Sequence, residues 1–398
     1  MTIDVERDNL QYDVIVVGGS IAGCATALSI FRSNPNASIL VLDNADPDTF
    51  KIGESLPAAA KRDIAYLCPQ VLERVAESKD DVCVKCTGNA SSWGSSELEE
   101  TYAIMNPFGM GWHLDRARFD EILRENMATA APESISLIKG TFTEIGQTDG
   151  GARWALSAND LASETNHVYT STWVVDASGR KAAVARKLGS RTVKDDALLA
   201  FYAVFVRSSM TEDCDYRTLI EACQSGWWYS SPLPGDRRVV AYHTDDSNAT
   251  SRDARTLDGF INLLHGTTTH ISKLVAESEY DISIQPNTRY PVCTAAGSSR
   301  LQPLCQEDPS SGARWCAVGD AAMAFDPLSS QGMITAMKMG CVIGDIIAKD
   351  ILTVGPNDIP SAIIPQLYSQ VWSKYIEGKT YFYNSEKRFD GDFWRIRR

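Results

Sequence analysis

A run of β-branched residues, a glycine-rich turn and an apolar helix follow one another in residues 12–31. A strand that ends at such a turn leaves the first backbone amides of the helix pointing at whatever lies in front of it. A second apolar run ends in a carboxylate 20 residues after Gly23, where ribose hydroxyls can be bound. Ser20 occupies the position of the second glycine in the usual Gly-x-Gly-x-x-Gly pattern of dinucleotide-binding turns. The pattern predicts a βαβ unit that binds a dinucleotide through Gly18, Ser20, Ile21, Ala22, Gly23 and Asp43.

Residues 14–31 also form an uncharged stretch that is long enough to raise the alternative of a transmembrane helix. Glycines interrupt this stretch directly after the β-branched run, so a strand, a turn and a buried helix fit better. Residues 1–13 are acidic and polar, unlike a signal or transit peptide. Ten cysteines without an export signal are expected to be reduced thiols, so we expect a cytoplasmic protein. Cys83 and Cys86 form a lone CxxC pair, for which ordinary packing is the simpler interpretation.

The charge balance limits the kind of partner that this chain can bind. Its 38 Lys and Arg residues stand against 51 Asp and Glu residues, which gives a formal net charge of −13 at pH 7. Nucleic acids and anionic membranes both require a cationic surface, so we expect neither as a partner. The spacing of histidines, cysteines and carboxylates predicts no metal site.

The order of the remaining elements predicts a nucleotide-binding domain that is assembled from distant pieces of the chain. We expect helices over 116–127 and 332–352, strands over 136–139, 153–157, 167–175 and 315–318, and a hairpin of 227–233 with 238–244. We predict an α/β fold class with three parts. Residues 10–83, 110–196 and 291–352 form a Rossmann-like cofactor-binding domain, residues 84–109 and 197–290 an antiparallel β-sheet substrate domain, and residues 353–398 a helical C-terminal segment.

Two further strand ends carry residues that suit a bound cofactor. One strand ends in Asp176 and is followed by a glycine turn. Another delivers Gly319 and Asp320 to its carboxyl end, and a loop with Pro327 then leads into the helix that begins at Gly332. The free amides and positive dipole of that helix end suit a group that becomes negative on reduction, such as the N1/O2 edge of a flavin.

Taken in this order, the three motifs resemble those of the FAD-dependent monooxygenases of the p-hydroxybenzoate hydroxylase fold, a superfamily that includes the tryptophan halogenases. The resemblance covers nearly the whole chain. It implies FAD as cofactor, O₂ as co-substrate, NAD(P)H or another reductant, and hydroxylation of an electron-rich aromatic ring through a flavin C4a-hydroperoxide. It places Asp320 at the ribityl chain and Pro327 beside the isoalloxazine ring. The other cofactor-binding residues that it implies are Arg116, Asp176, Gly319, Gln331, Gly332 and Met333.

Further short motifs resemble a narrower group, the flavoproteins that assist biogenesis of tryptophylquinone cofactors in bacterial oxidases. These motifs lie at 53–57, 106–109, 111–116, 297–300, 326–332 and 393–398. The resemblance implies that the partner is a precursor protein of a quinone-cofactor oxidase and that the aromatic substrate is one of its tryptophan side chains. It adds Glu54 and Ser55 to the predicted cofactor-binding residues.

Three different functions also fit these motifs. The first is flavin-dependent halogenation. Residues 226–232 and Lys85 partly resemble the Gly-Trp-x-Trp-x-Ile-Pro stretch and the lysine of flavin-dependent halogenases, although Tyr229 and Ser231 replace the second Trp and the Ile. The residues around Lys85 otherwise match poorly, and a solvated side chain is the simpler explanation of this lysine. The second is hydroxylation of a small aromatic metabolite, and the third is a non-catalytic, FAD-dependent maturation chaperone.

Candidates for contact with the substrate come mostly from the predicted hairpin. Trp227 and Tyr229 lie on one face of a strand and are the candidate substrate-binding residues. His243 and His113 are the candidate acid/base groups, and Pro327 completes the predicted catalytic set. Because a protein substrate must reach the flavin, we expect an open cleft beside Pro327, bordered by the sheet that carries Trp227, rather than a closed pocket.

Overall fold

The predicted βαβ unit forms the centre of a mostly parallel sheet in the computed structural model, which describes residues 10–46, 49–77, 82–148, 150–208, 215–283, 289–306, 312–353 and 359–398. Its parallel part has the order β8-β2-β1-β10-β19. The antiparallel β9 pairs with the outer ends of β8 and β10. The strands are β1 (Leu10–Val17), β2 (Ile39–Asp43), β8 (Ile135–Gln147), β9 (Trp154–Asp160), β10 (Asn166–Asp176) and β19 (Arg314–Ala317). The buried β1 and β2 read as apolar runs because helices cover parallel sheets on both faces.

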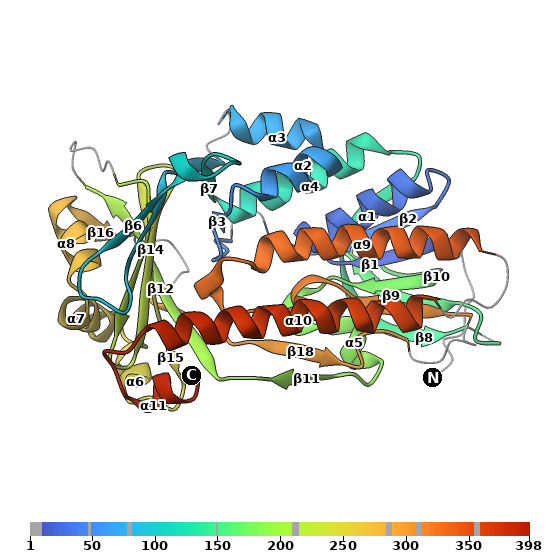
Figure 1. Cartoon of the computed structure of the whole chain (residues 1–398). Coiled ribbons are helices and arrows are strands. Elements are labelled where there is room, and N and C mark those ends of the chain that lie inside the picture. The colour runs from blue at the N-terminus through green and yellow to red at the C-terminus, as the bar shows by residue number, and fades with distance from the viewer. Residues whose placement is uncertain are drawn as a thin grey trace.

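Helices from distant parts of the chain pack around this sheet (Figure 1). They are α1 (Ile21–Ser33), α2 (Ala60–Leu67), α3 (Pro69–Ala76), α4 (Arg116–Ala130), α5 (Ala183–Lys187) and α9 (Gly332–Leu352). α9 lies directly against α1, although 298 residues lie between Ser33, the last residue of α1, and Gly332. Gly340 and Gly344 make this close approach possible. A Cβ at Gly340 would lie 2.8 Å from the Ala22 carbonyl oxygen, and one at Gly344 would lie 2.7 Å from that of Thr26.

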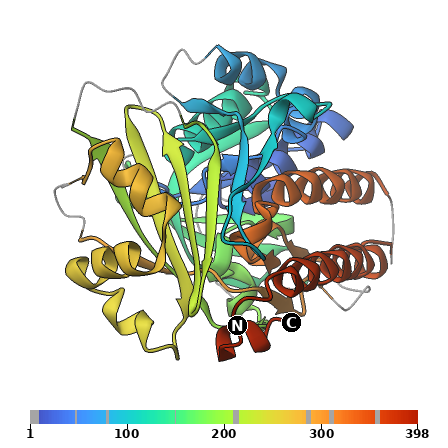
Figure 2. The same ribbon diagram turned by 60° about the vertical axis from the view of Figure 1, so that its left-hand side comes forward.

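A second, eight-stranded sheet stands beside the first and is antiparallel except where β13 meets β5. Its strands are β16 (Tyr280–Ile282), β12 (Leu198–Arg207), β15 (Arg237–Asp245), β14 (Gly226–Leu233), β13 (Thr218–Cys223), β5 (Gly88–Ser92) and β6 (Glu99–Tyr102), with β17 (Val292–Ala295) also paired to β12. α6 (Thr250–Asp253), α7 (Leu257–Thr267) and α8 (His270–Glu277) cover its outer face (Figure 2). The inner face of this sheet is therefore turned toward the first sheet and its helices.

Short elements and a long helix join the two sheets. β3 (Ser55–Leu56), β7 (Gly111–Leu114) and β4 (Cys83–Cys86) form one small sheet, and β11 (Arg191–Lys194), β18 (Ser299–Gln302) and β20 (Met323–Ala324) form another. The 3₁₀ turns are η1 (Ala103–Met105), η2 (Gly179–Lys181), η3 (Gly319–Ala321) and η4 (Pro327–Ser329). α10 (Ile359–Ser385) runs beside α9 and reaches the large sheet, where α11 (Asp392–Arg395) packs (Figure 1).

The predicted α/β fold class, with a Rossmann-like domain, an antiparallel sheet and a helical C-terminal segment, is confirmed. The predicted helix over 332–352 has the bounds of α9, and the hairpin is β14 and β15. The predicted strand-turn-helix over residues 12–31 is also found. Within the described residues, no helix has the length and apolar content needed to cross a bilayer. The assignment of the three parts to separate domains stays a prediction.

Candidate cofactor site

The turn between β1 and α1 meets the steric demands of a dinucleotide fingerprint. Gly18 has a φ of +113°, and a Cβ there would lie 2.3 Å from the Ala177 carbonyl oxygen. A Cβ at Gly23 would lie 1.9 Å from the Gly18 carbonyl oxygen. Ile21 and Ala22 open α1. Both glycines are therefore required for the tight turn and the close packing of helix on strand, and the first amides of α1 face the carboxyl edge of the sheet.

The hydroxyl of Ser20 has a different partner from the one expected of a phosphate ligand. Its Oγ donates to Asp120 Oδ2 at 2.8 Å, and Lys51 Nζ lies 3.1 Å from the same oxygen. Arg116 Nη2 lies 3.4 Å from Asp120 Oδ1 and its Nη1 donates to the Gly53 carbonyl at 2.9 Å. Burial opposes ionisation of Asp120, but Arg116, Lys51 and Ser20 hold its pKa below the usual value. Lys51 and Asp120, which sequence reasoning missed, thus position the predicted Arg116.

Asp43 stabilises the fingerprint turn, besides lying where a carboxylate can bind a ribose. Its Oδ1 accepts the Gly19 amide at 2.9 Å, and its Oδ2 lies 3.3 Å from Arg124 Nη1. Only 13% of its side chain is exposed. The carboxylate therefore reaches the predicted position at the carboxyl end of β2, with part of its hydrogen-bonding capacity already used.

Asp176 is better explained as a support for the turn after β10 than as a ligand of the cofactor. It is fully buried, its Oδ1 accepts from the Ser178 amide and hydroxyl at 3.0 and 2.6 Å, and its Oδ2 accepts the Ala185 amide at 2.8 Å. Burial raises its pKa. Because its two oxygens face the protein interior, we remove Asp176 from the predicted cofactor-binding set.

Asp320, in contrast, is accessible at the same edge of the sheet. It lies in η3 with 44% of its side chain exposed, 3.6 Å from Arg180 Nε. Arg180 is fixed in turn by the carbonyls of Gly297 and Phe325 at 2.6 and 3.2 Å. The preceding Gly319 has a φ of +58°, and a Cβ there would lie 2.7 Å from the Ala22 Cβ. The late motif and the fingerprint helix therefore meet at this point.

The loop before α9 is held in place by α10. Asp326 Oδ1 accepts the Leu328 amide at 2.9 Å, which caps η4 at Pro327. Its Oδ2 accepts from the Tyr383 hydroxyl at 2.7 Å, while its own amide donates to the Tyr375 hydroxyl at 2.9 Å. The two tyrosines of α10 thus fix both ends of one residue and, through it, the start of α9. Nothing in the local sequence pattern indicates this support.

The residues on this edge fit an FAD. Gln331 precedes α9 with an exposed side chain, and Met333 in its first turn is buried. A Cβ at Gly332 would meet no protein atom within 4 Å, so there is open space beside the start of α9. Gly319 and Asp320 line a shallow hollow together with the first turns of α9. A phosphate-binding turn, an accessible carboxylate and a helix N-terminus thus lie along one edge.

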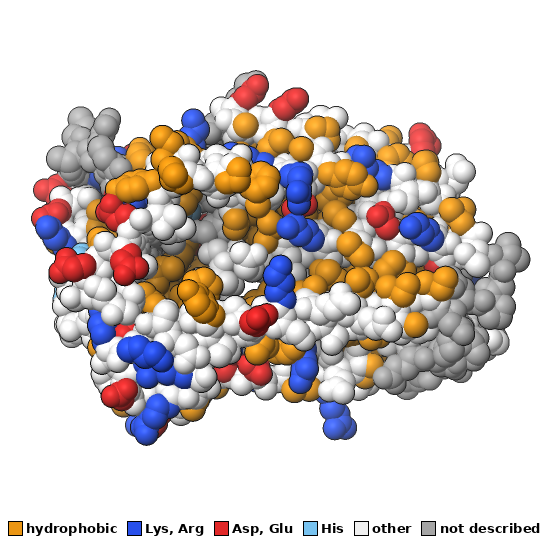
Figure 3. Space-filling model, in the orientation of Figure 1, with side chains coloured by type: hydrophobic (Ala, Val, Ile, Leu, Met, Phe, Trp, Pro, Cys, Tyr) orange, Lys and Arg blue, Asp and Glu red, His pale blue; other side chains and the backbone are white. Residues whose placement is uncertain are grey.

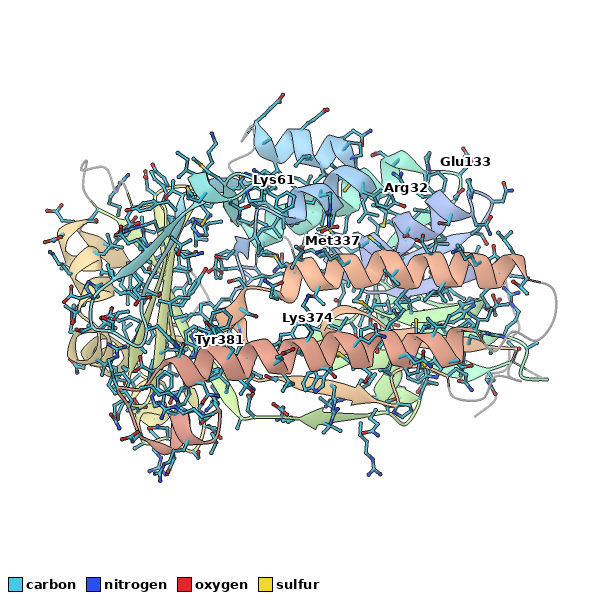
Figure 4. The ribbon with its side chains drawn as sticks, viewed as in Figure 1. Arg32, Lys61, Glu133, Met337, Lys374 and Tyr381 are labelled. Carbon is cyan, nitrogen blue, oxygen red and sulfur yellow. The ribbon has the colours of Figure 1, made fainter. Side chains whose placement is uncertain are left out.

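The surface is hollowed between the large sheet and helices α9 and α10 (Figure 3). Hydrophobic side chains lie on its borders, including Tyr381 at the end of α10 that approaches the sheet (Figure 4). Tyr381 is 70% exposed. The predicted open cleft beside Pro327 stays a prediction.

The family follows from the sequence as a whole. The profile of the family described as tryptophan halogenase matches residues 65–398, most of the chain. The chain belongs to the tryptophan halogenase family. Its predicted place among FAD-dependent halogenases and oxidoreductases, as a flavoprotein, is therefore confirmed at this level.

Two solved structures and one curated sequence show how far the likeness extends. LodB of Marinomonas mediterranea, whose assignment as an FAD-dependent oxidoreductase is provisional, is 29% identical over 394 residues, 97% of each chain. The myxobacterial chondrochloren halogenase CndH has a TM-score of 0.81 at 20% identity over 98% of this chain and 86% of its own. QhpG, a peptidyl tryptophan dihydroxylase essential for tryptophylquinone cofactor biogenesis, has a TM-score of 0.69 at 17% identity over 97% and 78%. The two structures share the fold.

In this member of the tryptophan halogenase family, β14 corresponds to the Gly-Trp-x-Trp-x-Ile-Pro stretch of halogenases, but its side chains have other contacts than we predicted. Trp227 is fully buried and stacks on His243 with ring centroids 3.7 Å apart, so we correct its predicted role from substrate contact to core packing. Tyr229 is only partly buried. Its hydroxyl shares a 2.7 Å hydrogen bond with Ser55 and donates to Ser231 at 3.0 Å. Ser55 is thus bound to the sheet domain, and Tyr229 keeps its place among the candidates near the substrate.

Lys85, the residue that resembles the halogenase lysine, lies exposed on β4 opposite Trp112 of β7. The Lys61 ammonium lies 4.8 Å from the centre of the Trp112 ring, and burial together with the nearby Lys85 lowers the pKa of Lys61. The sulfurs of Cys83 and Cys86 contact different carbonyls, those of Val75 and Gly88. In the described part of the chain, no cluster of three metal-binding side chains occurs.

The two candidate acid/base histidines are poorly placed for that role. His113 and His243 are 0% and 2% exposed. Burial lowers the pKa of both to about 3, with Arg238 adding to the effect at His113. Because neither ring is accessible to a bound aromatic ring, we no longer expect either to act directly on the substrate. Glu54, which is 1% exposed, is likewise turned inward: it accepts from the Gly53 amide and from Ser231.

Proposed function

We propose that this protein is an FAD-dependent monooxygenase that hydroxylates an electron-rich aromatic ring, and that the ring belongs to a tryptophan side chain of a precursor protein of a quinone-cofactor oxidase. NAD(P)H or another reductant would reduce the flavin, and O₂ would be the co-substrate. The likeness to LodB over 97% of both chains supports an FAD-dependent oxidoreductase, and the fold shared with QhpG supports the choice of a peptidyl tryptophan as substrate.

The observation that carries the choice of hydroxylation over halogenation is the polar character of β14. Where the halogenase stretch has a tryptophan and an isoleucine, this chain has Tyr229 and Ser231. Both are used in hydrogen bonds that lead to the buried Glu54. The lysine that halogenation would need is represented only by Lys85, which is exposed on a strand edge beside Lys61.

The chain itself binds the cofactor and stabilises its charge. FAD, when bound and reduced, supplies the activation of O₂ for transfer of one oxygen atom. The amides and dipole at the start of α9 stabilise negative charge, and Pro327 is held rigidly before them by Asp326. Asp320, oriented by Arg180, is available for the hydroxyls of the cofactor.

A protein substrate is supported by the hollow on the surface and its apolar borders (Figure 3). Ile104 and Met105 of η1, between β6 of the large sheet and β7 of the small sheet, are 86% and 84% exposed. Together with the exposed Tyr102, Phe108 and Met110 they form a group of apolar side chains within nine residues, which is typical of surfaces that bind another protein. A small-metabolite hydroxylase would instead enclose its ligand.

The test is turnover of chemically different substrates by the FAD-loaded protein. The flavin is reduced, mixed with O₂ and supplied with a tryptophan-containing precursor protein, free indole or free phenol, each with and without chloride or bromide. We expect one added oxygen atom on a tryptophan of the precursor protein, by mass spectrometry. Halide-dependent products would establish a halogenase, rapid hydroxylation of free indole or phenol a small-metabolite hydroxylase, and the absence of any product with a bound precursor a maturation chaperone.

Two variants separate cofactor binding from chemistry. Asp320→Ala removes a hydrogen bond to the cofactor and should weaken FAD binding by about 1–3 kcal/mol. Lys85→Ala should leave turnover unchanged, as should the matched variant Lys139→Ala on another exposed strand position. Loss of product in Lys85→Ala alone, with normal flavin reduction and reoxidation, would contradict the hydroxylase proposal.

A further inference from the structure

β6 is the last strand of the large sheet, and one of its edges pairs with no described strand. In the described part of the chain, its only partner is β5. The Ala103 amide donates to the Thr87 carbonyl at 2.8 Å, so these two residues are a hydrogen-bonded pair. Because such pairs alternate along an antiparallel ladder, the amides and carbonyls of Glu100 and Tyr102 point away from β5. Both residues therefore offer a donor and an acceptor to another strand.

The two ends of β6 lie on different sides of the hollow. At one end, the turn between β5 and β6 contacts α10 and the residues after it. Trp93 Nε1 donates to the Phe382 carbonyl at 2.8 Å, and the Gly94 amide donates to Glu386 Oε2 at 2.8 Å. At the other end, η1 leads into β7 of the small sheet. Figure 2 shows β5 and β6 on the side of the large sheet that is nearest α9 and α10, so a strand added to β6 would lie across the mouth of the hollow.

An added strand would turn every second side chain toward the cofactor domain. Thr101 of β6 lies opposite Asn89 of β5, which is in register with Thr218 of β13. Residues in register across a sheet share a face, and on this face Thr218 shares a 2.9 Å hydrogen bond with His113 of the small sheet. Glu99, two residues before Thr101, is on the same face. Alternate side chains of an added strand would therefore continue this face at the hollow.

The charge of this edge favours a basic partner. Residues 94–110 contain three glutamates, Glu97, Glu99 and Glu100, and no lysine or arginine. All three glutamates are exposed, and Arg217 pairs with Glu100. Like charges that lie opposite each other destabilise a strand pair, whereas opposite charges stabilise it. The glutamates therefore oppose pairing with a second copy of β6 and favour a strand that carries lysine or arginine.

Exposed apolar side chains flank both ends of the same edge. Ile104 and Met105 of η1 lie at one end. Tyr381 and Phe382 of α10 are 70% and 46% exposed at the other end, where Trp93 contacts α10. These side chains can pack against apolar residues before and after a paired segment. In recognition by strand addition, main-chain hydrogen bonds supply affinity and side-chain contacts supply selectivity.

We propose that an extended, basic segment of the substrate polypeptide binds as an additional strand on the free edge of β6. Its backbone pairs with Glu100 and Tyr102, its cationic side chains lie beside Glu99, and its tryptophan is turned into the hollow. The identity of this polypeptide as the substrate rests on the proposed function, but its binding requires no flavin chemistry. Because main-chain hydrogen bonds do not depend on side-chain identity, the segment is selected by its extended shape and its charge.

The first test measures peptide binding to the oxidised, FAD-loaded protein, in which no turnover occurs. The basic probe is a dye-labelled peptide in which lysine and valine alternate around one tryptophan. A second peptide has glutamate in place of lysine, and a third is the basic peptide with N-methylated backbone amides. Fluorescence anisotropy gives the affinity of each peptide. We expect the basic peptide to bind about 10-fold more tightly than either of the others.

The variants Tyr102→Pro and Tyr102→Ala separate the backbone of the edge from its side chain. Tyr102 has a φ of −89°, close to the range of proline, and its amide points away from β5. Both variants lose the phenol ring, but only proline removes the outward amide. We expect Tyr102→Pro to bind the basic peptide about 10-fold more weakly than Tyr102→Ala. In the wild-type protein, the peptide should slow hydrogen exchange at the amides of Glu100 and Tyr102.

A second pair of variants tests the charge of the edge. Glu99→Lys and Glu133→Lys make the same change of net charge, and both glutamates are exposed. Glu133 lies on the cofactor domain, far from β6 (Figure 4). We expect Glu99→Lys to weaken binding of the basic peptide about 5-fold and Glu133→Lys to leave it unchanged.

The inference is wrong if the basic peptide binds no more tightly than the glutamate or N-methylated peptide, or leaves the exchange at Glu100 and Tyr102 unchanged. It is also wrong if the free protein is a dimer that Tyr102→Pro converts to a monomer, since the edge then binds a second copy. If Tyr102→Pro does not fold, the N-methylated peptide gives the same answer with the wild-type protein. Peptide binding at β6 without oxygen transfer would contradict the proposed function alone. Hydroxylation of the precursor protein with equal KM by Tyr102→Pro and Tyr102→Ala would contradict this inference alone.

Discussion

Replacing helix glycines by alanine should separate the role of the α1–α9 contact from ordinary helix propensity. Gly340 and Gly344 of α9 face α1, and Gly378 lies in α10. A Cβ at Gly344 would lie 2.7 Å from both the Thr26 carbonyl oxygen and the Ser29 Cβ, whereas a Cβ at Gly378 would meet no atom within 4 Å. Glycine-to-alanine substitution can therefore be compared at two crowded positions and one open position.

The magnitude follows from two opposing effects. Alanine is more favourable than glycine by about 1 kcal/mol inside a helix. A methyl group inserted into a filled contact costs about 1–3 kcal/mol, and the upper end applies here because the neighbouring atoms belong to a backbone that cannot turn away. We expect Gly344→Ala and Gly340→Ala to lower the free energy of unfolding by about 2 kcal/mol, the difference of these values. Gly378→Ala should raise it by about 0.5–1 kcal/mol.

Urea unfolding followed by circular dichroism measures these differences, and FAD titration of the same variants adds a functional readout. Because α1 and α9 carry opposite ends of the cofactor site, Gly344→Ala should also weaken FAD binding. Gly378→Ala should not. If Gly344→Ala raises the urea midpoint as Gly378→Ala does, the close contact of the two helices does not position the site and the reasoning is refuted.

Other substitutions test the remaining features. Arg397→Met removes the side chain that pairs with Asp245. Because the Arg397 side chain is only 1% exposed, Asp245 is left as a buried, unpaired carboxylate, and the free energy of unfolding in thermal denaturation should fall by about 3–5 kcal/mol. Gly18→Ala forces a methyl group onto a carbonyl oxygen at 2.3 Å and should abolish FAD retention, seen as loss of flavin absorbance after gel filtration. Burial lowers the pKa of His113 and His243 from 6.5 to about 3, so only the unfolded chain takes up these protons in that window. The free energy of unfolding should therefore fall as the pH drops from 6.5 to 3, by about 1.4 kcal/mol per pH unit for each histidine, and His243→Gln should reduce that slope.

Local patterns predicted much of the cofactor edge. The contact of Gly23 with the Gly18 carbonyl lies within the turn itself and the helix that begins at Gly332 follows from its own periodicity, whereas the contact of Gly18 with Ala177 joins two strands. Their positions in the structure match because turn geometry and helix periodicity are properties of short segments. The predicted hairpin over 227–244 was confirmed for the same reason.

The inward or outward direction of a polar side chain could not be predicted in this way. Asp176 and Asp320 both follow buried strands, yet one is fully buried and the other is 44% exposed. That difference depends on contacts between segments far apart in the chain. The link between Glu54 and Ser231 joins residues 177 positions apart, and no local pattern records it.

The contact between α10 and the flavin loop has a consequence for the order in which the protein is completed. Tyr375 and Tyr383, which hold the amide and the carboxylate of Asp326, are synthesised after every other part of the cofactor edge. While these residues are still on the ribosome, the loop with Pro327 lacks its two supports. We therefore expect tight FAD binding to follow the synthesis and docking of α10, the helix that carries both tyrosines.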